Sequence, residues 1–295
     1  MTPLPSPVGL ASPIIADGAM GTALFGLGLP AGEAPEAWLL GDAGAAAVAA
    51  VHRGHVAAGA RIVLTSSFGA NALRLAGSPL EGRGAEVCRA AVTAAQAALG
   101  AGRCGAVIAG SLGPTGGLLM PYGTLDPGAV RAAYAEEAAA LAAAGVDVLW
   151  VETMMDLTEA VAAVDGAREG APGVPVVATM VFSRGRTMFG DRPDAAAGTL
   201  AEHGVTGVGA NCGDGFSSVL DVVPALAGAA PGLHVIAKAN AGAPVRGADG
   251  TTVYPGTPDE AADYARRAAD AGATIVGGCC GTTAEHIRAI AAALA

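Results

Sequence analysis

The stretch DPGAVRAAYAEEAAALAAAGVDVLWVE, residues 126–152, contains the repeating unit from which the fold of this chain can be predicted. Asp126 followed by Pro127 is typical of a helix start, because it offers an N-cap and a proline at the first helical position. The alanine-rich run ends near Gly145, and residues 146–152 are short and rich in β-branched side chains. Such a segment is typical of a buried strand. The stretch therefore predicts a helix that leads directly into a strand.

The same pairing of strand and helix recurs eight times along the chain. The predicted strands are Ile14–Met20, Arg61–Phe68, Ala106–Leu112, Val146–Glu152, Val174–Phe182, Gly207–Cys212, His234–Asn240 and Thr274–Cys279. Alternation of this kind predicts a parallel sheet of the α/β class, and eight units predict closure into a (β/α)8 TIM barrel. A doubly wound open sheet is the alternative. Because no linker-like stretch is present, we expect residues 1–295 to form a single domain.

Several helix starts are predicted from the spacing of a capping box. The pairs with this spacing are Asp156 with Glu159, Thr257 with Glu260, and Thr282 with Glu285.

Composition limits the classes of function. Of the 295 residues, 52% are hydrophobic and 14% are charged, and the net charge is −10, which argues against nucleic acid and anionic membranes as partners. No run approaches the ~18 apolar residues of a membrane span, and the start MTPLPSPVGL does not resemble a secretory signal. Five cysteines without the density of a disulfide scaffold fit a reducing compartment. We therefore expect a soluble, cytoplasmic protein.

Three of the cysteines stand where a metal site would need them. Cys212 ends the segment GVGANC, and the adjacent pair Cys279 and Cys280 ends TIVGGCC. In a barrel, both segments end at the C-terminal rim, where active sites gather, and the neighbouring glycines would let the adjacent pair turn to one side. Three thiolates and one open position are typical of a catalytic zinc ion. The sequence therefore predicts a Zn²⁺ site, with buried apolar cysteines as the alternative.

The other cysteines and the histidines are predicted to be structural. Cys88 lies in the helical run EVCRAAVTAAQ, and Cys104 precedes the third strand at the opposite rim. The histidines, most of them on predicted helices, are His52, His55, His203, His234 and His286.

Other predicted strand ends carry polar residues. Asp17 follows the first strand, and Glu152 ends the fourth, where a carboxylate needs a cation or hydrogen-bond donors. Two carboxylates that face a zinc–thiolate cluster suggest a substrate with an ammonium group. The alternative for Asp17 is a turn residue that bonds its own backbone. Ser66, Asn211 and Asn240 end other strands, and nearby glycine-rich turns could present N–H groups to a substrate carboxylate.

The segments DGAMGT, LTSSFGAN, GSLGPTG, VETMMDLTEA, GANCG, KANAGAP and GGCCGTTAEHIRAI occur in the order found in the homocysteine S-methyltransferase family. The chain resembles this family over residues 14–293. The family includes the homocysteine-binding barrel of cobalamin-dependent methionine synthase, betaine–homocysteine methyltransferase and S-methylmethionine–homocysteine methyltransferase. KANAGAP and TTVYPGTPDEAADY look closer to the methionine synthase barrel.

The resemblance implies zinc-dependent transfer of a methyl group to the thiol of L-homocysteine, which gives methionine. It implies that the three rim cysteines bind the zinc, and that Asp17 and Glu152 help to hold the homocysteine amino group. Gly18 and Ala19 would contribute backbone contacts.

The resemblance leaves the methyl donor open among a methylcorrinoid partner protein, a betaine-like compound and a sulfonium compound. No segment resembles the folate, cobalamin or activation domains of methionine synthase, or the C-terminal extension of the betaine enzyme. A cationic donor would favour an aromatic cage. Candidate aromatic residues near the rim, which could equally just cover the barrel mouth, are Phe25, Trp38, Phe68, Tyr122, Phe182 and Tyr254.

Two other functions are compatible with the same residues. Lys238 is the only lysine and lies inside the seventh predicted strand, so an inward-facing side chain could form a Schiff base in a lyase. A non-catalytic binding barrel stabilised by zinc is the second alternative.

Overall fold

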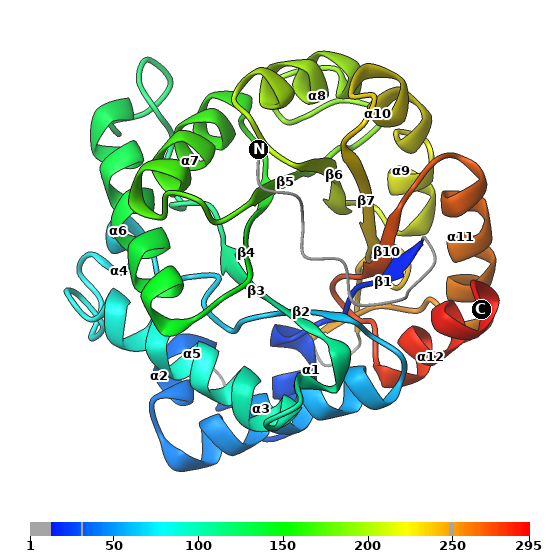
Figure 1. The fold of residues 1–295 in the computed structure, drawn as a ribbon, viewed down its shortest axis with the longest axis horizontal. Helices are drawn as coiled ribbons and strands as arrows, with labels where there is room; N and C mark the ends of the chain where they lie inside the picture. The colour runs from blue at the N-terminus through cyan, green and yellow to red at the C-terminus, as the bar shows by residue number, and fades with distance from the viewer. Residues whose placement is uncertain (1–12, 31, 248–250) are drawn as a thin grey trace.

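The computed structural model describes residues 13–30, 32–247 and 251–295, and its centre is an eight-stranded parallel barrel (Figure 1). The strands are β1 (Ile14–Ile15), β2 (Ile62–Leu64), β3 (Val107–Leu112), β4 (Val148–Met154), β5 (Val176–Met180), β6 (Gly207–Cys212), β7 (His234–Ala239) and β10 (Ile275–Gly278). Their order is β1-β10-β7-β6-β5-β4-β3-β2. A parallel bridge between Ala16 and Ile62 joins the two ends. The predicted barrel is confirmed, and the open sheet is wrong.

Helices surround the strands on all sides (Figure 1). The longer ones are α3 (Asp42–Ala57), α5 (Gly84–Leu99), α6 (Pro127–Ala144), α7 (Leu157–Gly170), α8 (Pro193–Glu202), α10 (Val223–Ala229), α11 (Pro258–Asp270) and α12 (Ala284–Ala293). Shorter ones are α1 (Gly21–Gly26), α2 (Pro35–Leu39), α4 (Ala72–Leu75) and α9 (Phe216–Leu220), with a 3₁₀ turn at Arg103–Gly105. None of the helices in the described ranges is long and apolar enough to cross a bilayer.

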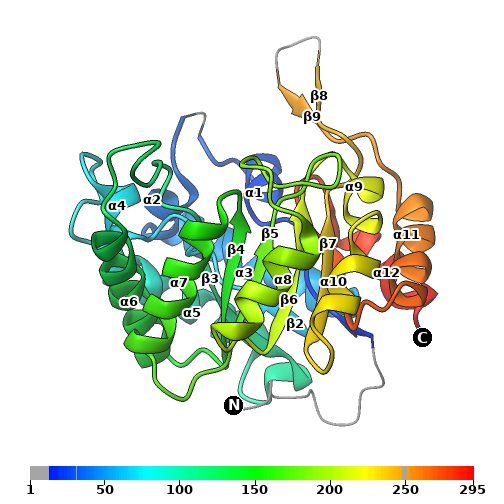
Figure 2. The same ribbon diagram turned by 90° about the horizontal axis from the view of Figure 1, so that it is seen from above.

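A small antiparallel hairpin follows β7. Its strands, β8 (Val245–Arg246) and β9 (Thr252–Val253), stand above the C-terminal rim of the barrel (Figure 2). This hairpin was not predicted from the sequence.

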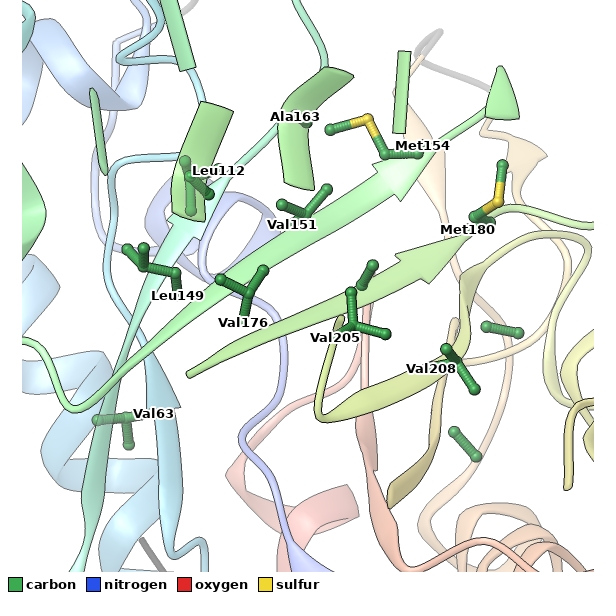
Figure 3. Packing of buried hydrophobic residues seen from close by; sticks show 14 of the residues in the cluster. Val63, Leu112, Leu149, Val151, Met154, Ala163, Val176, Met180, Val205 and Val208 are labelled. Carbon is green, nitrogen blue, oxygen red and sulfur yellow. The ribbon is translucent and has the colours of Figure 1, made fainter. Parts of the chain in front are cut away.

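Two layers of apolar side chains hold the barrel together. Outward-facing side chains such as Leu149, Val151 and Val176 belong to the large cluster between strands and helices (Figure 3). The barrel interior is filled by Ile14, Ala16, Ile62, Leu64, Val107, Ala109, Val148, Trp150, Val177, Ile236 and Ile275. Because successive strand residues point to opposite faces, the strands can supply both layers.

Two of the predicted helix starts have the expected caps. The Asp126 side chain accepts a hydrogen bond from the Ala129 N–H at 2.9 Å, and α6 ends at Gly145, which has a left-handed φ of 99°. Thr257 and Glu260 form a complete capping box at the start of α11.

The other two predicted caps need correction. Asp156 caps α7, but Glu159 accepts hydrogen bonds from Thr115 instead of completing a box. The Thr282–Glu285 prediction is wrong, because the N-cap of α12 is Thr283 and its partner is His286. The Thr282 hydroxyl is used elsewhere, donating to the Cys279 carbonyl at 2.6 Å.

Candidate active site

The inward-facing positions of the barrel change from apolar to polar toward the C-terminal rim. On β4, Val148 and Trp150 belong to the apolar interior, and Glu152 is the next residue of that face. On β7, Lys238 follows Ile236 in the same way. Lys238 therefore lies on the inward face of its strand. The fold places a polar layer directly above a closed apolar floor.

The three rim cysteines converge on one point. The Sγ atoms of Cys212, Cys279 and Cys280 all lie within 4.8 Å of one another. The strands that end in these residues both pair with β7: Cys212 is opposite Ala239, and the Cys279 N–H donates to the Ala239 carbonyl at 2.7 Å. Sulfurs bound at about 2.3 Å to one tetrahedral zinc stand roughly 3.8 Å apart. The observed cluster fits that spacing.

The backbone conformation determines the direction in which these thiols point. Cys212 has φ of 64°, a left-handed conformation that turns it away from the regular alternation of β6. Gly281, with φ of 78°, follows the cysteine pair, and a Cβ there would lie 2.2 Å from the Cβ of Tyr254. The tight turn after the pair therefore requires glycine.

The thiols strongly perturb one another. Hydrogen bonding with Cys279 is the largest influence that raises the pKa of Cys212 to about 12. Hydrogen bonding with Cys212 is the largest influence that raises the pKa of Cys280 to about 11. Three thiolates at this spacing need a cation to coexist, which is what a divalent metal supplies. The donor set therefore fits zinc chemically as well as geometrically.

Asn211 ties the thiol cluster to β4. The register of β4 against β5 shifts between Val151 and Met154, and Thr153 within this bulge has φ of 61°. The Thr153 N–H donates to Asn211 Oδ1 at 2.9 Å, and Asn211 Nδ2 donates to Thr153 Oγ1 at 2.8 Å. The same Nδ2 group lies 3.7 Å from Cys279 Sγ. Bulges often re-aim side chains near active sites, and this one adjoins Glu152.

Glu152 is a buried carboxylate that faces the barrel interior. Its Oε1 accepts a hydrogen bond from the Ser111 hydroxyl at 2.6 Å. Burial raises the pKa of Glu152, while the Lys238 charge and the Ser111 hydrogen bond lower it. A carboxylate in this environment would be stabilised by a further cationic donor.

Asp17 is engaged within the protein. Lys238 Nζ lies 2.5 Å from Asp17 Oδ1, and the Leu64 N–H donates to Oδ2 at 2.7 Å. Lys238 Nζ also donates to the Asp17 carbonyl at 3.1 Å and lies 5.7 Å from the centroid of the Trp150 ring. An ammonium paired in this way has no free electron pair with which to form a Schiff base.

The remaining predicted substrate residues differ in their availability. A Cβ at Gly18 would lie 2.8 Å from Thr282 Oγ1, and the Ala19 N–H already donates to that oxygen at 3.1 Å. Ser66 is buried just after β2. Asn240 Nδ2 donates to the Gly213 carbonyl at 2.8 Å, whereas its buried Oδ1 has no partner in the described part of the chain.

The six aromatic residues do not form one cage. Phe182 is buried in the apolar core, and Trp38 packs against that core. Phe68 lies under the guanidinium of Arg74. Tyr254 lies beside the thiols, since Cys280 contributes to raising the pKa of its hydroxyl, after burial.

Two of these six aromatic residues are exposed at the surface, Phe25 at 60% and Tyr122 at 76%. The Tyr122 ring pairs with Phe189 at 5.6 Å between centroids.

Among the described side chains, none of the residues expected to be structural belongs to the thiol cluster. Cys88 is buried in α5, where burial raises its pKa. Cys104 is in the 3₁₀ turn before β3, and its side chain is outside the described residues. His52 and His55 are buried on α3, His203 pairs with Asp165, His234 contacts Thr274, and His286 caps α12.

Sequence reasoning missed several residues of this layer. Ser111 could have been found, because it continues the inward face of Val107 and Ala109 on β3. Nothing in the sequence marks Thr153, because the position of a bulge depends on the register of two strands. Thr282 was assigned to a helix cap although its hydroxyl binds the turn between β10 and α12.

Known proteins resemble this chain in both sequence and fold. The profile of the homocysteine S-methyltransferase family matches residues 14–294. The methionine synthases of Mycobacterium tuberculosis and Mycobacterium leprae are each 35% identical over 254 residues, which cover 83% of this chain and 21% of theirs. The chain thus spans about a fifth of these relatives.

The crystal structure of the homocysteine methyltransferase MmuM from Escherichia coli, in its metallated form, superimposes with a TM-score of 0.81. It is 23% identical, and the match covers 98% of this chain and 99% of that one. That likeness supports the fold, and the family profile covers nearly the whole barrel together with its thiol cluster. The chain therefore belongs to the homocysteine S-methyltransferase family.

Proposed function

We propose that the whole chain, residues 1–295, is one homocysteine-binding barrel that transfers a methyl group from a methylated donor to the thiol of L-homocysteine, giving methionine. The observation that carries the proposal is the convergence of Cys212, Cys279 and Cys280 within 4.8 Å at the rim of a barrel of this family. In the reaction, the homocysteine thiol loses its proton, its sulfur forms a bond to the methyl carbon, and the bonding electrons of the old bond leave with the donor.

The three rim cysteines would hold a zinc ion through their sulfurs. When bound, zinc would favour the thiolate form of a substrate thiol at neutral pH. Asn211 would help to orient the Cys279 ligand, since its Nδ2 group contacts both the Cys279 sulfur and Thr153 in the bulge of β4. Such outer contacts commonly fix the geometry of a metal site.

Glu152 is our candidate for direct contact with the homocysteine ammonium. Its carboxylate is buried, faces inward and has Ser111 as a hydrogen-bond donor, so it retains acceptor capacity for a cation. Asp17 would act on the site without touching the ammonium, because both of its carboxylate oxygens already have partners. The unpartnered Oδ1 of Asn240 is a further acceptor at the rim.

Gly18, Ala19 and Ser66 would form the walls of the homocysteine site. The Ala19 N–H is engaged by Thr282, so this residue would contribute shape more than a hydrogen bond from its backbone.

The donor can be a small cationic molecule or a separate methylcorrinoid protein. Tyr254 lies beside the thiols, where its ring could face a cationic methyl group. The methionine synthase relatives are several times longer than this chain, which suggests a larger donor carrier. We expect no nucleic-acid partner, given the net charge of −10.

A donor screen tests this function. The zinc-loaded protein is incubated with homocysteine and, in turn, a betaine, a sulfonium compound and a methylcorrinoid, and methionine is measured by mass spectrometry. We expect one donor class to give methionine and Cys280→Ser to abolish it. If zinc and homocysteine both bind but no donor class gives methionine, the chain is a binding barrel and the proposed transfer is wrong.

A further inference from the structure

Among the described residues, the polar layer of the barrel contains three charged side chains. Its charged side chains are Asp17, Glu152 and Lys238. His52 and His55 on α3 are close enough to Asp17 to interact with its charge, and burial lowers the pKa of both, so near neutral pH they add no charge. Two carboxylates and one ammonium leave one net negative charge in the layer.

Lys238 and Asp17 form a dry ion pair. Their side chains are 3% and 4% exposed, and Nζ lies 2.5 Å from Oδ1. Nζ has a second contact at the Asp17 carbonyl, and Oδ2 of the same aspartate is held by the Leu64 N–H. This arrangement fixes the Asp17 carboxylate toward Lys238 and β2.

The same lysine also acts on Glu152. The Lys238 charge lowers the pKa of Glu152 and the Asp17 charge raises it, so all three groups are close enough to interact. Without the lysine, two buried carboxylates would repel each other, which disfavours ionisation of both. A buried charge without a partner is costly, so the lysine offsets part of the cost of keeping both acids in the barrel.

We propose that Lys238 is a positioning residue that cancels the charge of Asp17, so that Glu152 alone presents one net negative charge to the substrate. The inference rests on the proposed function and specifies its selectivity: the site would accept a thiol that carries a single ammonium group. Binding of that ammonium offsets the charge of Glu152. Asp17 then acts through Lys238 and not by touching the amino group.

Affinity for two thiols provides the readout. One is homocysteine, and the other is 4-mercaptobutanoate, which has the same thiol and carboxylate but no amino group. Their dissociation constants are measured by calorimetry on the zinc-loaded protein, without any methyl donor. The ratio of the two constants reports recognition of the ammonium, because a general structural defect would weaken both thiols together.

Four variants separate the charge from the contact. Asp17→Asn leaves Glu152 and Lys238 to cancel each other, and we expect the ratio to fall by about tenfold or more, as for a lost charge interaction. Asp17→Asn with Lys238→Met restores one net negative charge and should recover the ratio to within about threefold of wild type. The matched control, Asp17→Asn with Lys238→Arg, keeps the cation and should remain defective. Lys238→Met alone should keep or exceed the wild-type ratio.

The outcome for the double variant decides whether Asp17 acts through Lys238 or touches the ammonium itself. Zinc content and circular dichroism establish that the variants are folded. If the Asp17→Asn, Lys238→Met protein is no better than Asp17→Asn, then Asp17 touches the ammonium itself and the inference is overturned.

Two further results keep the test decisive. Should Asp17→Asn fail to fold, a fall in the ratio for folded Lys238→Met would still overturn the proposal. A wild-type protein that binds neither thiol would contradict the proposed function as well, whereas failure of the rescue alone leaves that function standing.

Discussion

At the scale of single residues, Cys212 reaches the other thiols because its backbone turns to φ of 64°. We expect Cys212→Ser, Cys279→Ser and Cys280→Ser each to lose most of the bound zinc, since serine is a poor ligand for this metal. Cys88→Ala is the matched control, because Cys88 is buried in α5 away from the cluster, and it should keep the wild-type content. Metal analysis after dialysis measures the difference. Unchanged zinc in all three serine variants would contradict the metal assignment.

Asn211 is a single side chain that connects two parts of the site. Asn211→Ala leaves the Thr153 N–H unpartnered in a left-handed conformation, so we expect a loss of about 1–3 kcal/mol in the free energy of unfolding. Homocysteine should also bind more weakly, because Glu152 precedes the residue that Asn211 holds. Urea denaturation and calorimetry measure the two effects. Unchanged values in both would mean that the bulge is held by strand pairing alone.

At the scale of elements, the start of α11 depends on the reciprocal bonds between Thr257 and Glu260. Thr257→Ala should reduce the free energy of unfolding by about 1 kcal/mol, as for other lost N-caps. Thr93→Ala is the control, since Thr93 is an exposed residue within α5 whose hydroxyl bonds only the preceding turn. Urea denaturation should show a lower free energy of unfolding for Thr257→Ala than for Thr93→Ala. Equal stabilities would argue that packing alone fixes this helix end.

Helix α3 makes the stability of the barrel depend on pH through His52. Burial is the largest cause that lowers its pKa from 6.5 to about 4, with Asp17 opposing and His55 adding to the decrease. The unfolded chain therefore takes up a proton below pH 6.5 that the folded chain accepts only below about pH 4. The stabilising contribution is complete above pH 6.5 and is lost as pH falls through this window. The total loss is about 3 kcal/mol.

His52→Leu tests this contribution, because leucine fills the buried position without titrating. Between pH 6.5 and pH 4, the wild type should lose about 3 kcal/mol of unfolding free energy relative to the variant. Above pH 6.5, the difference in unfolding free energy between the two proteins should not depend on pH. Urea denaturation at a series of pH values gives the comparison. Parallel curves for the two proteins would show that the pKa of His52 is the same in the folded and the unfolded chain.

At the scale of the whole molecule, the barrel could be predicted from local signals that repeat. Eight short strands alternate with helices, and helix starts such as Asp126 and Thr257 have caps that depend on a few neighbouring residues. The thiol cluster followed from the same topology, because strands six and eight of a barrel both flank strand seven. Local residue patterns and the closed topology of the barrel were together enough to predict the thiol cluster at the C-terminal rim.

The contacts across the barrel could not be predicted. Lys238 and Asp17 are 221 residues apart, and their pairing depends on the register of the strands that carry them. The bulge at Thr153 depends equally on how β4 lies against β5. Thr282 and Thr283 are adjacent and chemically alike, so the sequence could not show which one caps α12.

The burial of the only lysine has a practical consequence for amine-directed chemistry. Acylating reagents that label surface lysines on most proteins would find no accessible lysine on the folded chain. An adduct at Lys238 would require the barrel to open and the ion pair to break. The time course of Lys238 labelling in a mass spectrometer would therefore count openings of the barrel, and zinc or homocysteine would slow it to the extent that they hold the barrel closed.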